Sequence, residues 1–293
     1  MTIIGRGILV LRNHGARNVV RYAYLVALAR LLLIRNRLWR GGITGMCPVD
    51  VSITSYGSRL SSAAISIESI ARGSSRPRRI VLWLDHSFEH KEFPPALRRL
   101  INRGLEVGFV DDIGVHTKYY PYVQSNEPYP VPMVLADDDT IYRRGWLDGL
   151  FRSYTPGTAT VLCQRAWRVV VDGDSLAPYD TWQLCADTRP SFRNLATGVG
   201  GVLYPPEALR RIGSAGEAFR TVCPTNDDIW LHSVMVDAGI RTQQVVRTPP
   251  KERTVPGSQI TALSHENVLA GQNDVQVRNA YNLGHILRIR TDA

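Results

Sequence analysis

Short apolar segments alternate with segments of helical spacing in the first half of the chain, and this alternation constrains the fold more than any other feature. Ile80–Leu84 and Val131–Ala136 are nearly continuous apolar runs, as expected of strands buried on both faces of a parallel sheet. Between such runs, apolar residues recur at helical spacing, as in Arg59–Arg72. We therefore predict an α/β fold, with a mostly parallel sheet flanked by helices, that begins at about residue 48.

The same criteria assign the other elements. The predicted strands are Val51–Thr54, Ile80–Leu84, Leu105–Val110, Val131–Ala136, Ala159–Cys163, Trp167–Val171, Val199–Tyr204 and Ile240–Val246. The predicted helices are Arg59–Arg72, Pro94–Arg103, Glu207–Ile212 and Asp227–Ala238. The segment from Pro249 to Ala293 is polar and mixed, and no element is predicted in it.

Residues 1–42 contain eight arginines and no acidic residue, so they carry most of the net charge of +9. Their longest uncharged apolar stretch, Tyr22–Ala29, is much shorter than the roughly 20 residues of a membrane span. Arginines among leucine, tyrosine and tryptophan are typical of a helix that lies in the membrane interface, which predicts binding to an anionic membrane surface. A helix packed on the domain is the alternative. The nearly neutral remainder of the chain does not favour nucleic acid as a partner.

Three consecutive carboxylates, Asp137, Asp138 and Asp139, follow directly after one of the apolar runs. Ligands of open α/β sheets bind beyond the carboxyl ends of the strands. Carboxylates this close repel one another unless a cation is present, and Mg²⁺ and Mn²⁺ prefer oxygen ligands. Because alternate residues of an extended chain face the same side, we expect Asp137 and Asp139 to hold the metal and Asp138 to point elsewhere. An acidic turn before a helix is the alternative.

The triple aspartate resembles the DxD motif of the GT-A glycosyltransferases, and the chain from about residue 48 to 245 resembles their family 2-like branch. Val51–Tyr56 is similar to the first strand and turn of that family, which implies donor contacts at Thr54 and Tyr56. Asp85 takes the place of the acidic residue that contacts the nucleoside. It is followed by His86, whereas the family usually has a paired acidic motif there.

Two further segments carry the resemblance to the acceptor side of such enzymes. The stretch 197–201 is similar to their glycine-rich loop, which implies acceptor contacts at Gly198, Gly200 and Gly201. The stretch 223–228 is similar to the ED-type motif, with Asp227 where the family usually has Glu. This implies that Asp228, or secondarily Asp227, is the general base. Locally, Thr225 and Asp228 also fit a capping box, and the glycines also fit a tight turn.

Three other residues are candidates for the site. Lys118 could neutralise the diphosphate of a nucleotide sugar, or could be a solvated loop lysine; Asp137 and Asp138 are the other nucleotide-sugar-binding candidates beside it. His265 resembles the late histidine that completes the metal shell in many GT-A enzymes, although a lone histidine is more often structural. Trp230 could stack on an acceptor sugar, or could be a core aromatic.

The resemblance implies a GT-A fold and a metal-dependent glycosyltransferase that uses Mn²⁺ or Mg²⁺ and a nucleotide-diphosphate sugar, with a UDP-sugar as the first expectation. Inverting transfer with Asp228 as base is favoured, and retaining transfer stays open. The alternatives are a phosphohydrolase of the haloacid dehalogenase kind, which also has an Asp-x-Asp after an apolar strand, and a non-catalytic membrane-binding module.

These inferences divide the chain into a membrane-associating segment (1–42), a catalytic domain (43–248) and a C-terminal segment that closes over the site (249–293). The basic segment suggests an acceptor that is lipid-linked or part of a cell-envelope glycan. Four scattered cysteines without a CxxC pair indicate free thiols in a reducing compartment. We therefore expect a cytoplasmic protein, peripherally associated with the inner face of the cell membrane.

Overall fold

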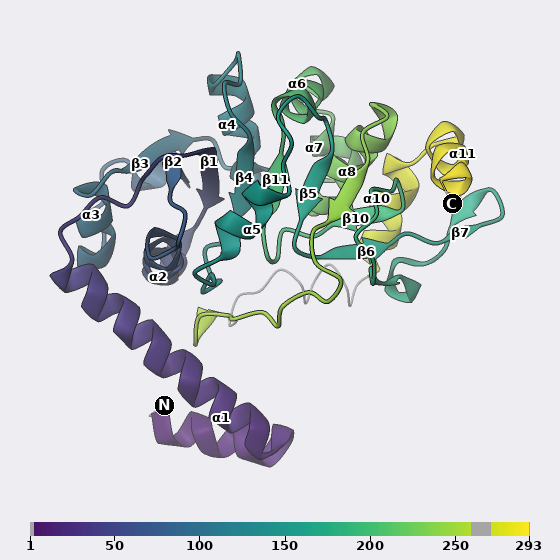
Figure 1. The fold of residues 1–293 in the computed structure, drawn as a ribbon. Coiled ribbons are helices and arrows are strands. Elements are labelled where there is room, and N and C mark those ends of the chain that lie inside the picture. The colour runs from purple at the N-terminus through teal and green to yellow at the C-terminus, as the bar shows by residue number, and fades with distance from the viewer. Residues whose placement is uncertain (1–2, 259–270, 293) are drawn as a thin grey trace.

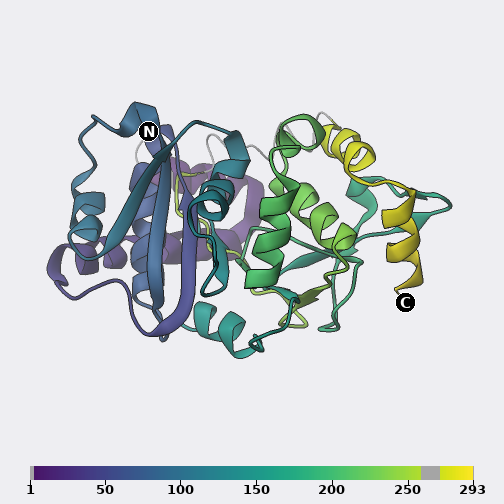
Figure 2. The ribbon, with the colours of Figure 1, turned by 90° about the horizontal axis from the view of Figure 1, so that it is seen from above.

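The computed structural model describes residues 3–258 and 271–292. Its body is a seven-stranded sheet with helices on both faces, which confirms the predicted α/β fold class (Figures 1 and 2). The strand order is β12-β5-β11-β4-β1-β2-β3, and only β11 runs antiparallel to its neighbours. The strands are β1 (Cys47–Thr54), β2 (Pro77–Asp85), β3 (Leu105–Val110), β4 (Met133–Ala136), β5 (Val161–Cys163), β11 (Val202–Tyr204) and β12 (Thr242–Gln244).

Helices and short strands fill the connections. The helices are α1 (Ile3–Leu38), α2 (Leu60–Ala71), α3 (Pro95–Ile101), α4 (Tyr120–Ser125), α5 (Trp146–Arg152), α6 (Pro206–Ala215), α7 (Phe219–Val222), α8 (Asp227–Asp237), α10 (Gln272–Ala280) and α11 (Leu283–Thr291), and the 3₁₀ turns are η1 (Gly57–Arg59), η2 (His86–Phe88), η3 (Gly114–Lys118) and η4 (Tyr179–Thr181). A small sheet joins β10 (Asn194–Ala196), β6 (Ala166–Arg168) and β9 (Gln183–Leu184), and β7 (Val171–Asp172) pairs with β8 (Ser175–Leu176).

The central strands bury side chains on both faces, and this is why their sequences read as continuous apolar runs. On β2, Ile80 and Leu82 face a core shared with α2 and α3, whereas Val81 and Trp83 face a second core shared with α6 and α8. On β4, Val134 and Ala136 face the first of these cores, whereas Met133 and Leu135 face the second. All four cysteines of the chain are free thiols.

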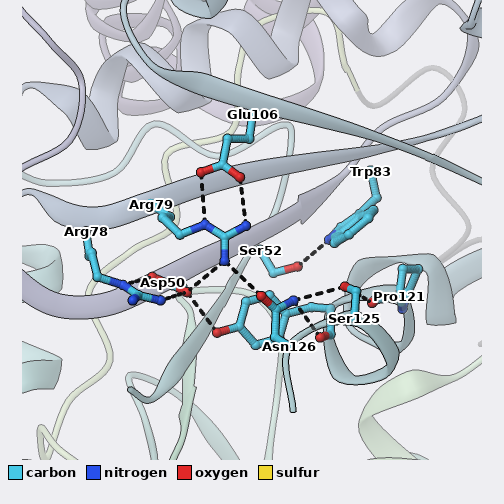
Figure 3. Close-up of polar contacts among 10 residues, drawn as sticks. Asp50, Ser52, Arg78, Arg79, Trp83, Glu106, Pro121, Ser125 and Asn126 are labelled. Carbon is cyan, nitrogen blue, oxygen red and sulfur yellow. Dashed lines mark hydrogen bonds and ion pairs between the residues drawn. The ribbon is translucent and has the colours of Figure 1, made fainter. Parts of the chain in front are cut away.

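A buried polar network joins β1 to β2 and to α4 (Figure 3), and β1 also bonds to the segment that precedes α4. Asp50, which is fully buried, accepts two hydrogen bonds from Arg78, at 2.9 and 2.7 Å, and a third from the hydroxyl of Tyr122. The hydroxyl of Ser52 accepts from the indole nitrogen of Trp83 and donates to the carbonyl of Lys118 at 2.6 Å. These bonds fix the end of η3, and therefore Lys118, at the carboxyl edge of the sheet.

Helix α1 has a packed part and an exposed part, and it lies along one side of the body (Figures 1 and 2). Leu28 and Leu32 are buried in a cluster with Val255, and the carboxylate of Glu68, fully buried on α2, binds Arg35 among other groups. Apolar side chains on its other side are exposed, among them Val20, Leu31, Ile34 and Leu38. Within the described residues, none of the helices has both the length and the apolar character needed to cross a membrane.

The described part of the polar C-terminal segment contains two helices that its sequence does not indicate. Helices α10 and α11 pack on α8. The buried face of α10 includes Asn273 and Gln276, which bond to Asn226 and Thr225 before α8. Because this face is held by hydrogen bonds as well as by apolar contacts, the apolar periodicity that predicts a helix is weak there.

Candidate active site

The structure brings seven of the predicted site residues together around one cavity. The cavity has a volume of about 690 Å³ and lies at the carboxyl ends of β1, β2 and β4, where parallel strands deliver their following residues to the same edge. Its lining includes Thr54, Tyr56, Asp85, Lys118, Asp137, Asp138 and Asp139. The carboxylate of Asp85 accepts a hydrogen bond from the backbone nitrogen of Ser87 at 2.9 Å, which orients it at the cavity wall.

The three aspartates are held by two different cations. Asp137 accepts from the ammonium of Lys118 at 2.7 Å. Asp138 is buried, accepts from the hydroxyl of Ser55 at 2.6 Å and pairs with Arg59. Asp139 also pairs with Arg59, at 2.9 Å. The strict alternation that we expected from Asp137 to Asp139 is therefore wrong, because β4 ends at Ala136 and the chain turns directly after it.

The charges of this cluster fit a divalent cation. Burial, followed by the charge of Asp137, raises the pKa of Asp139 to about 6 although Arg59 opposes the shift. Burial also raises the pKa of Asp138. Among the described residues no group of three His, Cys, Asp or Glu side chains forms a complete metal shell. One or two carboxylates completed by phosphate oxygens are nevertheless usual for Mg²⁺. The candidate ligand His265 lies outside the described residues.

Lys118 is a buried cation between carboxylates and not a solvated loop lysine. Its nitrogen lies 2.7 Å from Asp137 and 3.6 Å from Asp227. Burial alone would lower its pKa, but Asp137, Asp227 and Asp228 together raise it well above the ordinary value. Lys118 therefore stays charged and links the triple aspartate to the start of α8.

The carboxylate of Asp228 points from α8 toward the glycine loop. Asn226 caps α8, because its side chain accepts from the backbone nitrogen of Ile229 at 3.0 Å. Asp228 instead accepts from the backbone nitrogen of Gly198 at 2.9 Å, so the capping box proposed for Thr225 is not formed. Burial, followed by the charge of Asp227, raises the pKa of Asp228.

Gly198 lies between two groups of carboxylates, the triple aspartate after β4 and Asp227 with Asp228 at the start of α8. A Cβ atom built on Gly198 would lie 3.1 Å from the nitrogen of Lys118, and 3.6 Å from a carboxylate oxygen of both Asp137 and Asp228. Only a residue without a side chain leaves this space open. The predicted metal-side and base-side carboxylates therefore face a common space at Gly198.

Three other predicted acceptor contacts lie apart from this point. Gly200 lines a second, adjoining cavity. Gly201 packs against Trp146, whose ring atoms would be 2.6 Å from an added Cβ. Trp230 is buried in the core beside Phe219, with ring centroids 6.3 Å apart, and lines neither cavity.

Arg59 lies outside the sequence prediction of the site. It pairs with two of the aspartates, and a single arginine after the first strand gives no signal in the sequence. The segment 249–258 belongs to the C-terminal segment that is expected to close over the site, and its Glu252 and Thr254, which are not among the predicted site residues, line the cavity. Its Val255 donates a backbone hydrogen bond to the carbonyl of Asp139 at 2.7 Å. We call residues 249–258 the strap.

The chain matches no protein-family model and no curated protein sequence. It is similar in structure to a 4-diphosphocytidyl-2C-methyl-D-erythritol synthase from Anaerococcus prevotii, with 10% identity and a TM-score of 0.46 over 78% of this chain and 96% of the other. A mannosyltransferase from Pyrobaculum calidifontis in complex with GDP-Man and Mn²⁺ gives 15% identity and a TM-score of 0.44 over 80% and 65%.

A third similar structure, GalNAc-T7 with UDP, GalNAc and Mn²⁺, gives 11% identity and a TM-score of 0.45 over 68% of this chain and 42% of the other. These three proteins are thus nucleotide-sugar transferases or a nucleotidyltransferase. All three TM-scores are below 0.5, and we therefore base the functional argument on the geometry of the site.

Proposed function

We propose that the chain is a glycosyltransferase that moves a sugar from a nucleoside diphosphate to a hydroxyl group of an acceptor. The observation that carries the proposal is the space at Gly198, which carboxylates from two different elements face. Asp137 comes from the end of β4 and Asp228 from the start of α8. Sugar transfer needs such a pair of functions, one for the departing diphosphate and one for the attacking hydroxyl.

The donor fits the first cavity with its diphosphate toward the triple aspartate. Asp137 and Asp139 would hold Mn²⁺ or Mg²⁺, which when bound would supply positive charge for the leaving diphosphate. Lys118 and Arg59 add two buried positive charges at the same place. The nucleoside, which we propose to be uridine, then lies toward Thr54, Tyr56 and Asp85 at the ends of β1 and β2.

Asp228 serves as the general base for the acceptor. The hydroxyl gives its proton to Asp228 while its oxygen bonds to the anomeric carbon. The bond from that carbon to the diphosphate oxygen breaks, and the nucleoside diphosphate leaves with the bonding electrons. The hydrogen bond from Gly198 orients the carboxylate. Its raised pKa suits the role, because a base with a pKa closer to neutral accepts a proton more readily.

We also propose that the exposed part of α1 binds the inner face of the cell membrane. Leu31 and Ile34 are 61% and 54% exposed on a helix rich in arginine. An apolar strip beside cationic side chains can insert into the interface and attract anionic lipid. The acceptor is then a lipid-linked or cell-envelope glycan presented at that surface.

The Asp228→Asn variant tests the proposal. Asparagine keeps the shape of the side chain but cannot take the proton, so transfer should fall by about 10²–10⁴-fold. Binding of the nucleoside diphosphate with Mn²⁺, measured by calorimetry, should be retained because Asp228 acts on the acceptor. Asp148→Asn, at the start of α5 and away from both cavities, is the matched control and should leave both measurements unchanged.

Two results would overturn the proposal. Near-normal transfer by Asp228→Asn would remove Asp228 as the base and favour Asp227 or a retaining reaction. Release of pyrophosphate in place of a nucleoside diphosphate would identify nucleotidyl transfer. Both products are separated by anion-exchange chromatography of the same reaction.

A further inference from the structure

A second cavity adjoins the proposed donor cavity on the other side of the glycine loop. Its volume is about 290 Å³, and it shares Thr140, Arg165, Val199 and Glu252 with the first cavity. Val199 separates Gly198, which faces Asp228, from Gly200, which lines the second cavity. A molecule bound in the second cavity is therefore next to the point where the two groups of carboxylates meet.

Four cations line this cavity, and among the described residues only one of them has a carboxylate partner. Arg165 pairs with Glu252 at 2.8 Å. The other cations of the lining, Arg143, Lys251 and Arg253, have no carboxylate partner within residues 3–258 and 271–292. Arg253 instead lies 5.6 Å from the ring of Tyr24 on α1.

The cations at this cavity are close enough to affect one another, and Arg143 donates to the backbone carbonyl of Lys251 at 3.5 Å. Burial, followed by the charge of Arg253, lowers the pKa of Arg143. The pKa of Arg72, at the end of α2, is lowered by burial and then by Arg144 and Arg253. Neighbouring like charges repel and so destabilise one another, and a bound anion would relieve this repulsion.

The inner part of the cavity suits a neutral polar group next to the anion. Tyr142 and Trp146 form an aromatic wall, with ring centroids 4.1 Å apart. Gln164 is only 8% exposed, and no described residue forms a hydrogen bond with its side-chain amide. Sugar hydroxyls could both donate to this amide and accept from it. Aromatic walls with a few convergent polar groups are typical of small-molecule sites.

We propose that the second cavity is the acceptor subsite and that it binds a sugar carrying a phosphate group. The sugar ring lies against Trp146 and Gln164, and the phosphate lies among Arg143, Lys251 and Arg253. This inference rests on the proposed function of the adjoining site. The acceptor is then a phosphorylated sugar, because a neutral glycan would supply no negative charge to Arg143, Lys251 and Arg253.

The position of the cavity bears on the source of the phosphate. The strap, which supplies Lys251 and Arg253 to the cavity, also contacts α1: Arg21 donates to the carbonyl of Glu252, and Arg253 lies over Tyr24. The cavity therefore opens beside the helix with the exposed apolar strip. A phosphate that links a sugar to a lipid and the phosphate of a free sugar phosphate have the same chemistry, and the experiment distinguishes them.

The test compares the full chain with the Arg143→Gln/Lys251→Gln variant. Both side chains are exposed and make no ion pair with a described residue, so the variant should fold normally. Arg210→Gln/Arg211→Gln, on the exposed side of α6, is the control of equal charge. Calorimetry measures binding of glucose 1-phosphate and of methyl glucoside, and binding of UDP with Mn²⁺ is measured in the same samples.

We expect the wild-type chain to bind glucose 1-phosphate about tenfold or more tightly than methyl glucoside, since charge-assisted hydrogen bonds supply the difference. The double variant should lose this preference and keep UDP binding, and the α6 control should keep both. Equal affinity of the wild-type chain for the two sugars, or an unchanged preference in the double variant, would overturn the assignment. Failure of the wild-type chain to bind UDP would instead contradict the proposed donor.

Vesicles identify the source of the phosphate. Phosphatidylcholine vesicles that contain a polyprenyl phosphate are compared with vesicles that contain the same amount of phosphatidylglycerol. Tighter binding to the polyprenyl phosphate, lost in the double variant, supports a lipid-linked acceptor. Equal binding to both vesicles, with the preference for glucose 1-phosphate intact, supports a free sugar phosphate as acceptor.

Discussion

The substitution Gly198→Ala places one methyl group between the proposed donor and acceptor sides of the site. The backbone of Gly198 is outside the left-handed region, so alanine can adopt it without strain. The added Cβ would lie 3.1 Å from the nitrogen of Lys118. That nitrogen would have to move by a few tenths of an ångström from a position fixed by its 2.7 Å contact with Asp137.

The expected effect is on catalysis and not on stability. A displacement of about 1 Å at a reacting group costs on the order of 10²-fold in rate. The smaller shift and the methyl group together should lower kcat by about 10- to 100-fold. The free energy of unfolding should change by less than about 1 kcal/mol, because loss of unfolded-state freedom favours alanine by roughly 0.4–1 kcal/mol.

Gly201→Ala is the contrasting variant in the same loop. Gly201 has φ +95°, and its added Cβ would lie 2.6 Å from a ring atom of the buried Trp146. Strained backbone and overpacking each cost about 1–3 kcal/mol, so we expect a loss of stability on the order of 2–4 kcal/mol.

Urea denaturation measures the stability of both variants, and initial rates at saturating donor and acceptor measure kcat. We expect opposite profiles for the two variants: Gly198→Ala should be stable but slow, and Gly201→Ala should be unstable. Normal kcat in Gly198→Ala would refute the idea that the two groups of carboxylates act on one reaction across Gly198. Loss of stability in Gly198→Ala equal to that of Gly201→Ala would show that the loop is purely structural.

Three further predictions concern the metal, the base and the membrane. Asp139→Asn should abolish Mn²⁺-dependent donor binding in calorimetry while the protein stays folded, and unchanged metal-dependent affinity would exclude this residue as a ligand. Because the pKa of Asp228 is raised above its ordinary value of 3.8, kcat should fall as the pH drops through that raised pKa. A pH–rate profile of Asp228→Asn should lack this limb; an unchanged limb would assign it to another group. Leu31→Ser/Ile34→Ser should reduce sedimentation with phosphatidylglycerol liposomes and leave donor binding intact, and equal sedimentation would exclude this strip as the anchor.

The part of the site that lies on strands can be predicted from the sequence. The apolar runs predict β2 and β4 to within three residues at each end, because strands buried on both faces are apolar throughout. The sequence also predicts β3, a half-buried edge strand, with its observed bounds. Parallel strands also bring their carboxyl ends to one edge of the sheet. The order of the runs along the chain is therefore enough to predict that Asp85 and Asp137 lie around one cavity, as they do.

The part of the site that depends on contacts between distant segments could not be predicted. The carboxylate partners of Arg59 lie 79 or more positions away in the sequence. The choice of Asn226 in place of Thr225 as the cap of α8 leaves Asp228 to bond with Gly198, 30 positions away. Local spacing contains no information about such pairs, because they follow from the relative positions of β1, β4 and α8 in the folded sheet.

The strap contacts the proposed metal site, the acceptor cavity and helix α1. These contacts determine how metal binding, acceptor binding and membrane binding can be separated by experiment. Its Val255 donates to the carbonyl of Asp139 and is buried with Leu28 and Leu32 of α1. Its Glu252 lines both cavities. Changes on the packed side of α1, or deletion of residues 1–42, therefore disturb the metal site and the acceptor cavity as well as any membrane contact. Only substitutions on the exposed side of α1 separate membrane binding from sugar transfer.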